Sequence, residues 1–323
     1  MKNSIIVLVE HFKGAIAEIT YEMLGAGRKL ADDLNVPLIA AVLGKGPNGF
    51  ISHLGAADLI TIVEDEKLEM ASPSVIADAL KSIYEQKESS IILIGGTNIT
   101  SGVGPVLASR LKLPFLNFCK DIRTAEGEII IKSQLFGGKI LSDTVVAGSK
   151  GVVAIYPGSF SPENGKINRG CEIEEIKIPP IQQKSCFKKY IEPEAGDVDV
   201  TKETILVSVG RGIENSDNIG IAEDLIGVIG GAIAASRPVI DQGWLPLSRQ
   251  IGKSGMIVKP KLYFALGISG APEHVEGMKD SELIIAINKD ASAPIFNVAH
   301  YGICADLQDI VPLLTDKLKA AKA

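Results

Sequence analysis

The chain has 323 residues and a mass of 34.2 kDa, which suggests two domains of about 150 residues each. Apolar residues make up 46% and charged residues 22%, as is usual in a globular protein, and the formal net charge is −6. This acidic balance and an aromatic content of 5% argue against nucleic-acid binding, which needs a clustered positive field or stacking rings.

The cysteines and the apolar runs exclude further classes of protein. Four cysteines are scattered without a C-x-x-C pair, so the sequence predicts neither a disulfide framework nor a zinc site. The apolar run at 5–9 is too short for a signal peptide, and the run at 225–235 is about half a membrane span and contains glycines. We therefore expect a soluble, cytoplasmic protein without membrane insertion.

The first half alternates strands and helices. The β-branched run at 5–9 is typical of a strand that is covered on both faces. Apolar spacing predicts the further elements, which are strands at 37–43, 59–63 and 91–94 and helices over about 15–34 and 74–84. This alternation favours a parallel sheet covered by helices. After about residue 114, short polar and apolar stretches indicate strands and hairpins without long helices.

The second half restarts the alternating pattern after a Pro- and Lys-containing connector at 179–199. The predicted elements are strands at 205–209, 231–235, 261–267, 283–288 and 295–298, a helix at 218–229, and a terminal helix opened by Pro312. The predicted fold is therefore α/β in two domains. The N-terminal one, at 1–190, has a parallel sheet, and the C-terminal one, at 200–323, is doubly wound.

Candidate ligand-binding residues follow the strands of the second half, where open parallel sheets bind ligands. Arg211 lies between the first two glycines of a G-x-G-x-x-G pattern, but Asn215 stands at the position of the third glycine. The alternative interpretation is therefore a glycine turn that carries a solvated Arg without a ligand. Ser236 and Arg237 follow the next strand, and Pro238 restricts the backbone so that the Arg could project into a cleft. A surface ion pair is the alternative for this Arg.

A Ser-Gly turn follows the strand at 261–267. Pro272 then stands at a plausible first helical position, which predicts a helix N-terminus that suits a phosphate or another anion. His274 follows it, with a structural hydrogen bond as the alternative role. Asn288 ends a buried strand with both a donor and an acceptor, and Asp306 lies in the last loop, although either could instead cap a turn or helix.

These stretches resemble the signature of the electron transfer flavoprotein alpha subunits. The matching segments are 210–212, 235–237, 241–244, 262–270, His274, 277–280, 285–290, 293–296 and 301–302. The resemblance is specific over about 205–311 and is weaker but collinear over the first half. It implies that the C-terminal domain holds FAD, and that the N-terminal domain is a nucleotide-hydrolase-like α/β scaffold without a nucleotide, which docks a beta subunit.

The resemblance also implies roles for individual residues. Arg211 would lie near the FAD phosphates, and Asn288, Asp306 and Leu307 would serve the adenosine end. The residues expected around the flavin and the pyrophosphate are Ser236, Arg237, Ile251, Gly252, Lys253, Ser254, Ser269, Gly270, Ala271, Pro272, Glu273 and His274. A reduced flavin gains negative charge, which Arg237 and His274 could stabilise, and the Ser254 hydroxyl could bond the flavin N5 edge.

Three positions depart from the family pattern. Pro272-Glu273 stands where the family usually has Ile-Gln, Lys253-Ser254 where it has Gln-Thr, and His300 where it has Asp. The first two bring a carboxylate and a cation near the expected flavin, so the sequence does not predict the reduction potential of that flavin. His300 could alter a contact between domains or between subunits.

The predicted function is that of an electron carrier without catalytic residues of its own. It would take electrons from dehydrogenases and pass them to a quinone-reducing or other acceptor oxidoreductase, as a heterodimer with a beta subunit. One alternative is the alpha subunit of an electron-bifurcating complex that uses NADH. Another is a nicotinamide- or nucleotide-binding enzyme or sensor, which the missing third glycine disfavours, as does Ala232 standing where an acidic ribose ligand would be needed.

Overall fold

The structure is a computed structural model that describes residues 3–180, 185, 187–189 and 198–322. The chain divides into two compact units, residues 1–189 and 190–323, called here the N-terminal and C-terminal units. Most of the connector predicted at 179–199 lies outside the described residues. Among the residues that are described, no helix combines the length and apolar character that crossing a membrane requires.

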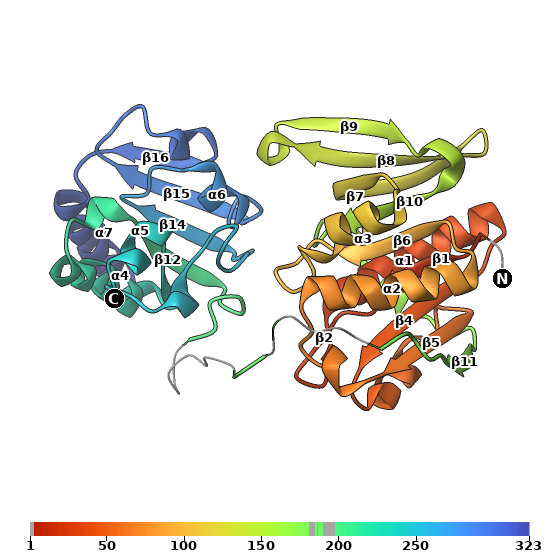
Figure 1. Cartoon of the computed structure of the whole chain (residues 1–323). Coiled ribbons are helices and arrows are strands. Elements are labelled where there is room, and N and C mark those ends of the chain that lie inside the picture. Colours follow the sequence, from red (N-terminus) through yellow and green to blue (C-terminus); the bar gives the residue numbers. More distant parts are fainter. Residues whose placement is uncertain (1–2, 181–184, 186, 190–197, 323) are drawn as a thin grey trace. The chain divides into compact units, whose positions relative to one another are not determined.

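The N-terminal unit is built on a nine-stranded sheet (Figure 1). Its helices and strands are β1 (Ile5–Leu8), β2 (His11–Phe12), β3 (Ala15–Ile16), α1 (Glu18–Leu34), β4 (Leu38–Gly44), β5 (Leu59–Glu64), α2 (Pro73–Lys87), β6 (Ile91–Gly95), α3 (Val103–Leu111), β7 (Phe115–Ala125), β8 (Glu128–Leu135), β9 (Ile140–Val145), β10 (Gly151–Ile155) and β11 (Glu172–Glu175). The strand order is β11-β5-β4-β1-β6-β10-β7-β8-β9. The strands from β11 to β7 run parallel, and β8 and β9 add an antiparallel hairpin at one edge.

Helices cover both faces of this sheet because β1 alternates between two apolar cores. Ile5 and Val7 belong to the core under α1, together with Met23, whereas Ile6 belongs to the core under α2 and α3, together with Leu80. The continuous apolar run of β1 therefore has the burial that its composition predicts.

The C-terminal unit contains a sheet of five parallel strands. Its elements are β12 (Ile205–Val209), α4 (Ile219–Ile229), β13 (Ala232–Ala235), α5 (Arg237–Asp241), β14 (Leu262–Leu266), α6 (Pro272–Glu276), β15 (Leu283–Asn288), β16 (Tyr301–Cys304) and α7 (Leu307–Lys322). The strand order is β13-β12-β14-β15-β16, so successive connections change direction between β12 and β14. Such a switch point is where open α/β sheets bind ligands, outside the carboxyl ends of their strands.

Two predictions about the end of the chain are wrong. The strand expected at 295–298 is a 3₁₀ turn, Pro294–Asn297, in which the amide of Phe296 donates to the carbonyl of Ala293. The fifth strand is β16 instead. Pro312 lies inside α7 rather than at its first position, because the helix already begins at Leu307. Apolar content alone did not separate a buried turn from a strand.

Candidate functional site

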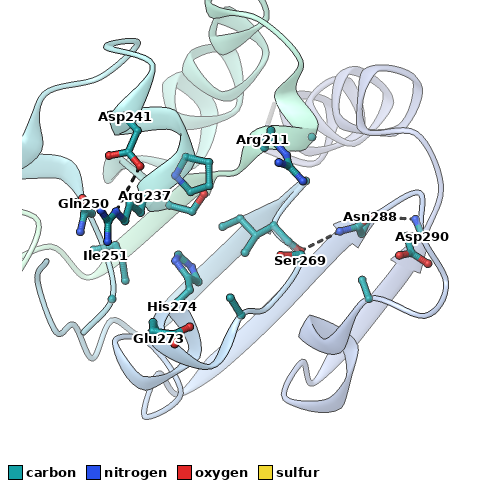
Figure 2. Close-up of a pocket in the computed structure, with 18 of the residues that line it drawn as sticks. Arg211, Arg237, Asp241, Gln250, Ile251, Ser269, Glu273, His274, Asn288 and Asp290 are labelled. Atoms are coloured by element: carbon teal, nitrogen blue, oxygen red, sulfur yellow. Dashed lines mark hydrogen bonds and ion pairs between the residues drawn. The ribbon is translucent and has the colours of Figure 1, made fainter. Parts of the chain in front are cut away.

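A cavity of about 710 Å³ lies in the C-terminal unit, beside the carboxyl ends of β12, β13, β14 and β15 (Figure 2). This volume falls in the range of small-molecule sites. Its lining residues are Arg211, Gly212, Glu214, Ser236, Arg237, Pro238, Asp241, Gln250, Ile251, Gly252, Lys253, Ser254, Gly267, Ile268, Ser269, Ala271, Glu273, His274, Asn288, Lys289, Asp290 and Ala293. The strand order alone would place a ligand here.

Glycines let the loops after β12 and β14 approach each other at the floor of the cavity. A Cβ on Gly212 would lie 2.7 Å from the Cα of Gly267, and the Gly212 amide donates to the Gly267 carbonyl over 3.0 Å. Gly267 also has φ +63°, a conformation that L-residues rarely adopt. Any side chain at either position would separate the two loops, so these glycines define the shape of the cavity floor.

The loop at 250–256 forms another wall and is fixed at both ends. The Ile251 amide donates to the Ala235 carbonyl, and the Lys253 amide donates over 2.8 Å to the carbonyl of Glu273 in α6. The Gln250 side chain donates to the Ser254 hydroxyl oxygen over 3.0 Å, which leaves the hydroxyl hydrogen free to bond a ligand. The loop therefore presents Ser254 in a defined position.

His274 is the buried titratable group of the cavity wall. Its Nε2 lies 2.9 Å from the Tyr263 hydroxyl, while its Nδ1 is buried and makes no hydrogen bond of ordinary geometry within the described chain. Burial lowers the pKa of His274 to about 4, and the Ile251 backbone opposes this only in part. The imidazole is therefore neutral near pH 7, and its buried Nδ1 keeps the capacity to form a hydrogen bond with a ligand.

Cations and carboxylates alternate around the rim of the cavity. Arg237 forms an exposed ion pair with Asp241, at 3.3 Å, and Lys289 forms another with Glu214, at 2.9 Å. Exposed pairs of this kind contribute little to stability, so an anionic ligand could replace the carboxylate partner. Arg211 is exposed and has no ion-pair partner among the residues that the structure describes.

Most residues predicted from the sequence line this one cavity, and four do not. Gly270 packs against the backbone of Ile295, Pro272 lies exposed in the first turn of α6, and Leu307 is part of the apolar core. Asp306 caps the start of α7, where its carboxylate accepts from the Gln308 amide. A ligand contact for these four stays a prediction, whereas their structural roles are visible.

Two predicted features differ in detail from the structure. Helix α6 has only five residues, so the helix dipole expected at Pro272 is small. Asn288 does line the cavity, but its amide already donates to the Ile268 carbonyl and accepts from the Asp290 amide, each over 2.9 Å. One hydrogen and one lone pair of the Asn288 amide remain for a ligand.

Sequence reasoning did not select the carboxylates of the rim, namely Glu214, Asp241 and Asp290, or the side chains of Gln250 and Lys289. The sequence feature that could have identified these residues is their position just after the strands and in the neighbouring loops. This feature predicts ligand binding only weakly, because charged residues in such loops are most often solvated.

The N-terminal unit has a buried carboxylate at the equivalent place between β1 and β6. Glu10 is 4% exposed and accepts hydrogen bonds from the hydroxyls of Thr97, at 2.7 Å, and Thr100, at 2.9 Å. Burial raises its pKa, and the two hydroxyls oppose the shift. A Cβ on Gly95 would lie 2.8 Å from this carboxylate, so the chain's own side chain fills the point between these strands.

Comparison with known proteins identifies the family. A family model described as an electron transfer flavoprotein domain matches residues 5–181, and one described as an electron transfer flavoprotein FAD-binding domain matches residues 199–279. The chain belongs to the electron transfer flavoprotein family, as an alpha subunit.

Curated relatives match this alpha subunit over nearly its whole length. The electron transfer flavoprotein subunit alpha of Bacillus subtilis is 30% identical over 322 residues, covering 99% of this chain and 98% of the relative. The acryloyl-CoA reductase electron transfer subunit beta of Anaerotignum propionicum is 32% identical, covering 98% and 95%. Subunit LctC of the lactate dehydrogenase (NAD(+),ferredoxin) of Acetobacterium woodii is 32% identical, covering 97% of this chain and 76% of its own.

The C-terminal unit of this alpha subunit therefore carries an FAD-binding domain, and the cavity residues suit that cofactor. The buried Nδ1 of His274, which makes no hydrogen bond of ordinary geometry within the described chain, offers a polar contact inside the wall. The close glycines at 212 and 267 leave room for a ligand against the backbone. Cationic side chains at the rim suit a diphosphate. The N-terminal unit, in contrast, has its equivalent point filled by Glu10.

Proposed function

We propose that this alpha subunit holds FAD in the cavity of its C-terminal unit and carries electrons between partner proteins. The observation that carries the proposal is the position of the cavity, at the switch point between β12 and β14 and within the FAD-binding domain of the family. When bound, FAD supplies the ability to accept and release electrons singly or in pairs. The chain's own residues bind and orient it.

Each wall of the cavity has a separate task in this proposal. Arg211, which has no ion-pair partner among the described residues, binds the phosphates. Asn288 contacts the adenosine end with its remaining hydrogen and lone pair. Arg237, whose ion pair with Asp241 is exposed and can be exchanged, stabilises negative charge on the flavin. The Ser254 hydroxyl donates to the flavin edge, from a loop that the Lys253 amide anchors to α6.

The N-terminal unit is proposed to dock a beta subunit through the hairpin of β8 and β9. Exposed apolar side chains gather there: Phe136 is 76% exposed, Leu141 59% and Ile140 51%. Strand β9 is also at the edge of the sheet, and its outer side pairs with no other strand among the described residues. An apolar edge strand without a partner strand promotes aggregation unless another protein covers it. Relatives such as the protein of Bacillus subtilis are named as alpha subunits, which implies that they assemble with another chain. A beta subunit is therefore the proposed occupant.

Dehydrogenases are the proposed electron donors, and a quinone-reducing or other oxidoreductase is the proposed acceptor. Bifurcation with NADH is a second candidate, because the relative LctC belongs to a lactate dehydrogenase named for NAD(+) and ferredoxin. A cytoplasmic location is also proposed, since the described cysteines, Cys119, Cys171 and Cys304, are free thiols.

The absorption spectrum of the complex purified with its partner tests the proposal. We expect flavin bands and at least one FAD per heterodimer. One flavin supports the simple carrier, and two support the bifurcating complex. A complex without any bound flavin, even after incubation with FAD, would contradict the proposed function.

A further inference from the structure

The buried pair of Tyr263 and His274 lies directly behind the cavity wall. Tyr263, in β14, has no exposed surface, and its hydroxyl lies 2.9 Å from Nε2 of His274 in α6. Figure 2 shows the imidazole projecting from α6 toward the cavity. The phenol is too deep to touch a ligand, so any effect on the site must pass through the His274 ring.

The surroundings of the phenol decide which of the two groups donates. A buried hydroxyl needs an acceptor for its hydrogen, and Nε2 is the one that meets ordinary hydrogen-bond geometry. The Ser208 hydroxyl lies near the same phenol but makes no hydrogen bond of that quality within the described chain. Burial also raises the pKa of Tyr263, which keeps its proton on the phenol. The phenol therefore donates, and Nε2 accepts.

A neutral imidazole that accepts at Nε2 must carry its one hydrogen on Nδ1. Nδ1 is the atom that is buried without a hydrogen-bond partner in the described chain. The Ile251 backbone raises the pKa of the ring, which opposes the larger effect of burial. The hydrogen bond from the phenol therefore places the ring hydrogen on Nδ1.

We propose that Tyr263 is a positioning residue, which fixes His274 as the Nδ1–H tautomer and so makes it a hydrogen-bond donor for the bound cofactor. The second half of this inference rests on the proposed function, whereas the tautomer is a property of the chain alone. Without the phenol, the ring could carry its hydrogen on Nε2 and offer only a lone pair at Nδ1.

The tautomer can be measured in the full-length chain without FAD. Histidine labelled with ¹⁵N gives separate signals for ring nitrogens with and without a hydrogen, and the chain has four histidines. The signals of His274 are those that disappear in His274→Gln. At pH 7 we expect hydrogen on Nδ1 and a bare Nε2. Hydrogen on Nε2 in the wild-type chain would overturn the proposal, whatever any variant does.

The variant Tyr263→Phe removes the donor and keeps the ring. We expect the Nδ1–H share of His274 to fall at least twofold, and the FAD dissociation constant of the complex to rise about fivefold to tenfold, as for one lost hydrogen bond. The matched control is Tyr301→Phe, because Tyr301 is 66% exposed in the same unit and does not line the cavity. The control should change neither quantity. An unchanged His274 tautomer in a folded Tyr263→Phe chain would also overturn the proposal.

The two measurements separate this inference from the proposed function. If the complex does not bind FAD but His274 is the Nδ1–H tautomer, the proposed function fails and the tautomer assignment stands. If FAD binds and His274 carries its hydrogen on Nε2, the inference fails and the proposed function stands.

Discussion

Glu273 and His274 are neighbours in sequence, and the structure gives their side chains opposite surroundings. Glu273 is exposed and lines the cavity, and its backbone carbonyl holds the loop at 250–256 through the Lys253 amide. His274 is buried and neutral, with Nε2 hydrogen-bonded to Tyr263 and with Nδ1 making no hydrogen bond of ordinary geometry among the described residues. We therefore expect Glu273 to affect a bound cofactor through its charge and His274 to affect it through a hydrogen bond.

The charge of Glu273 should lower the potential of a nearby cofactor, because a fixed negative charge opposes the addition of an electron. A unit charge about 8 Å away contributes about 2 kcal/mol at an effective dielectric of about 20. Solvent screening of this exposed side chain reduces that to about 1 kcal/mol. This corresponds to on the order of 40 mV for a one-electron couple. We expect Glu273→Gln to raise the first reduction potential by a few tens of millivolts in a potentiometric titration.

The matched control for this change is Glu282→Gln, since Glu282 is exposed in the same unit and does not line the cavity. It should leave the potential within about 10 mV of the wild type, because screening reduces the effect of a more distant charge. An unchanged or lower potential in Glu273→Gln would mean that the carboxylate only occupies the first turn of α6.

The low pKa of His274, about 4, predicts how stability depends on pH. Between about pH 6.5 and pH 4, the unfolded chain binds a proton at this residue that the folded chain does not. The stability of the C-terminal unit should therefore fall as pH drops through this window. His274→Gln should flatten that dependence by on the order of 1–3 kcal/mol.

Urea unfolding at pH 7 and pH 4.5, followed by the fluorescence of Trp244, measures this change, because the only tryptophan of the chain lies in the C-terminal unit. His300→Gln is the control: that ring is on an exposed residue, and its Nδ1 accepts from the Ile284 amide. Equal pH dependence in wild type and His274→Gln would contradict the assignment of a buried neutral imidazole.

At the scale of elements, the sequence predicted the strands well wherever apolar runs are buried on both faces. The runs at 205–209 and 283–288 became β12 and β15 with the predicted limits. The run at 295–298 became a turn, since the residues that define it pack against the sheet without joining it. The loops after the strands were predicted as ligand-binding, but their mutual contacts were not, because Gly212 and Gly267 meet only when the sheet is assembled.

Asn288 joins two of these loops, through the Ile268 carbonyl and the Asp290 amide. We expect Asn288→Ala to cost on the order of 1–3 kcal/mol in FAD binding, since it removes polar partners at the cavity wall and loosens both loops. Fluorescence titration of the flavin-free complex with FAD measures this as a dissociation constant raised about tenfold. The exposed Asn297 lies outside the cavity, so Asn297→Ala should bind FAD like the wild type. Equal affinities in all three proteins would exclude Asn288 from the site.

At the scale of the whole molecule, the two units share an α/β construction and differ at the point where a ligand would bind. Glu10 fills that point in the N-terminal unit, whereas the C-terminal unit leaves a cavity of about 710 Å³. The N-terminal unit instead exposes an apolar edge at β9. This difference supports the proposal that the C-terminal unit binds the cofactor and the N-terminal unit docks the partner subunit.

Charges on the hairpin should disrupt docking. We expect the double variant Phe136→Lys, Leu141→Lys to weaken association with the beta subunit at least tenfold, because each lysine would have to be desolvated in the interface. Sedimentation of the mixed subunits measures the association. Ile173→Lys is the control, since Ile173 is 53% exposed on β11 at the opposite edge of the same sheet. Equal weakening by the control would place the interface elsewhere.

FAD binding in the cavity beside β12 and β14 can be tested by filling that cavity and counting the bound flavin. Ala271 is exposed on its wall, so Ala271→Trp adds a bulky side chain there without entering the apolar core. Ala320→Trp places the same side chain at the exposed end of α7 as a control. The absorbance of the purified complexes should show one flavin fewer per complex in Ala271→Trp than in the wild type and the control. A full flavin content in a folded Ala271→Trp complex would contradict the claim.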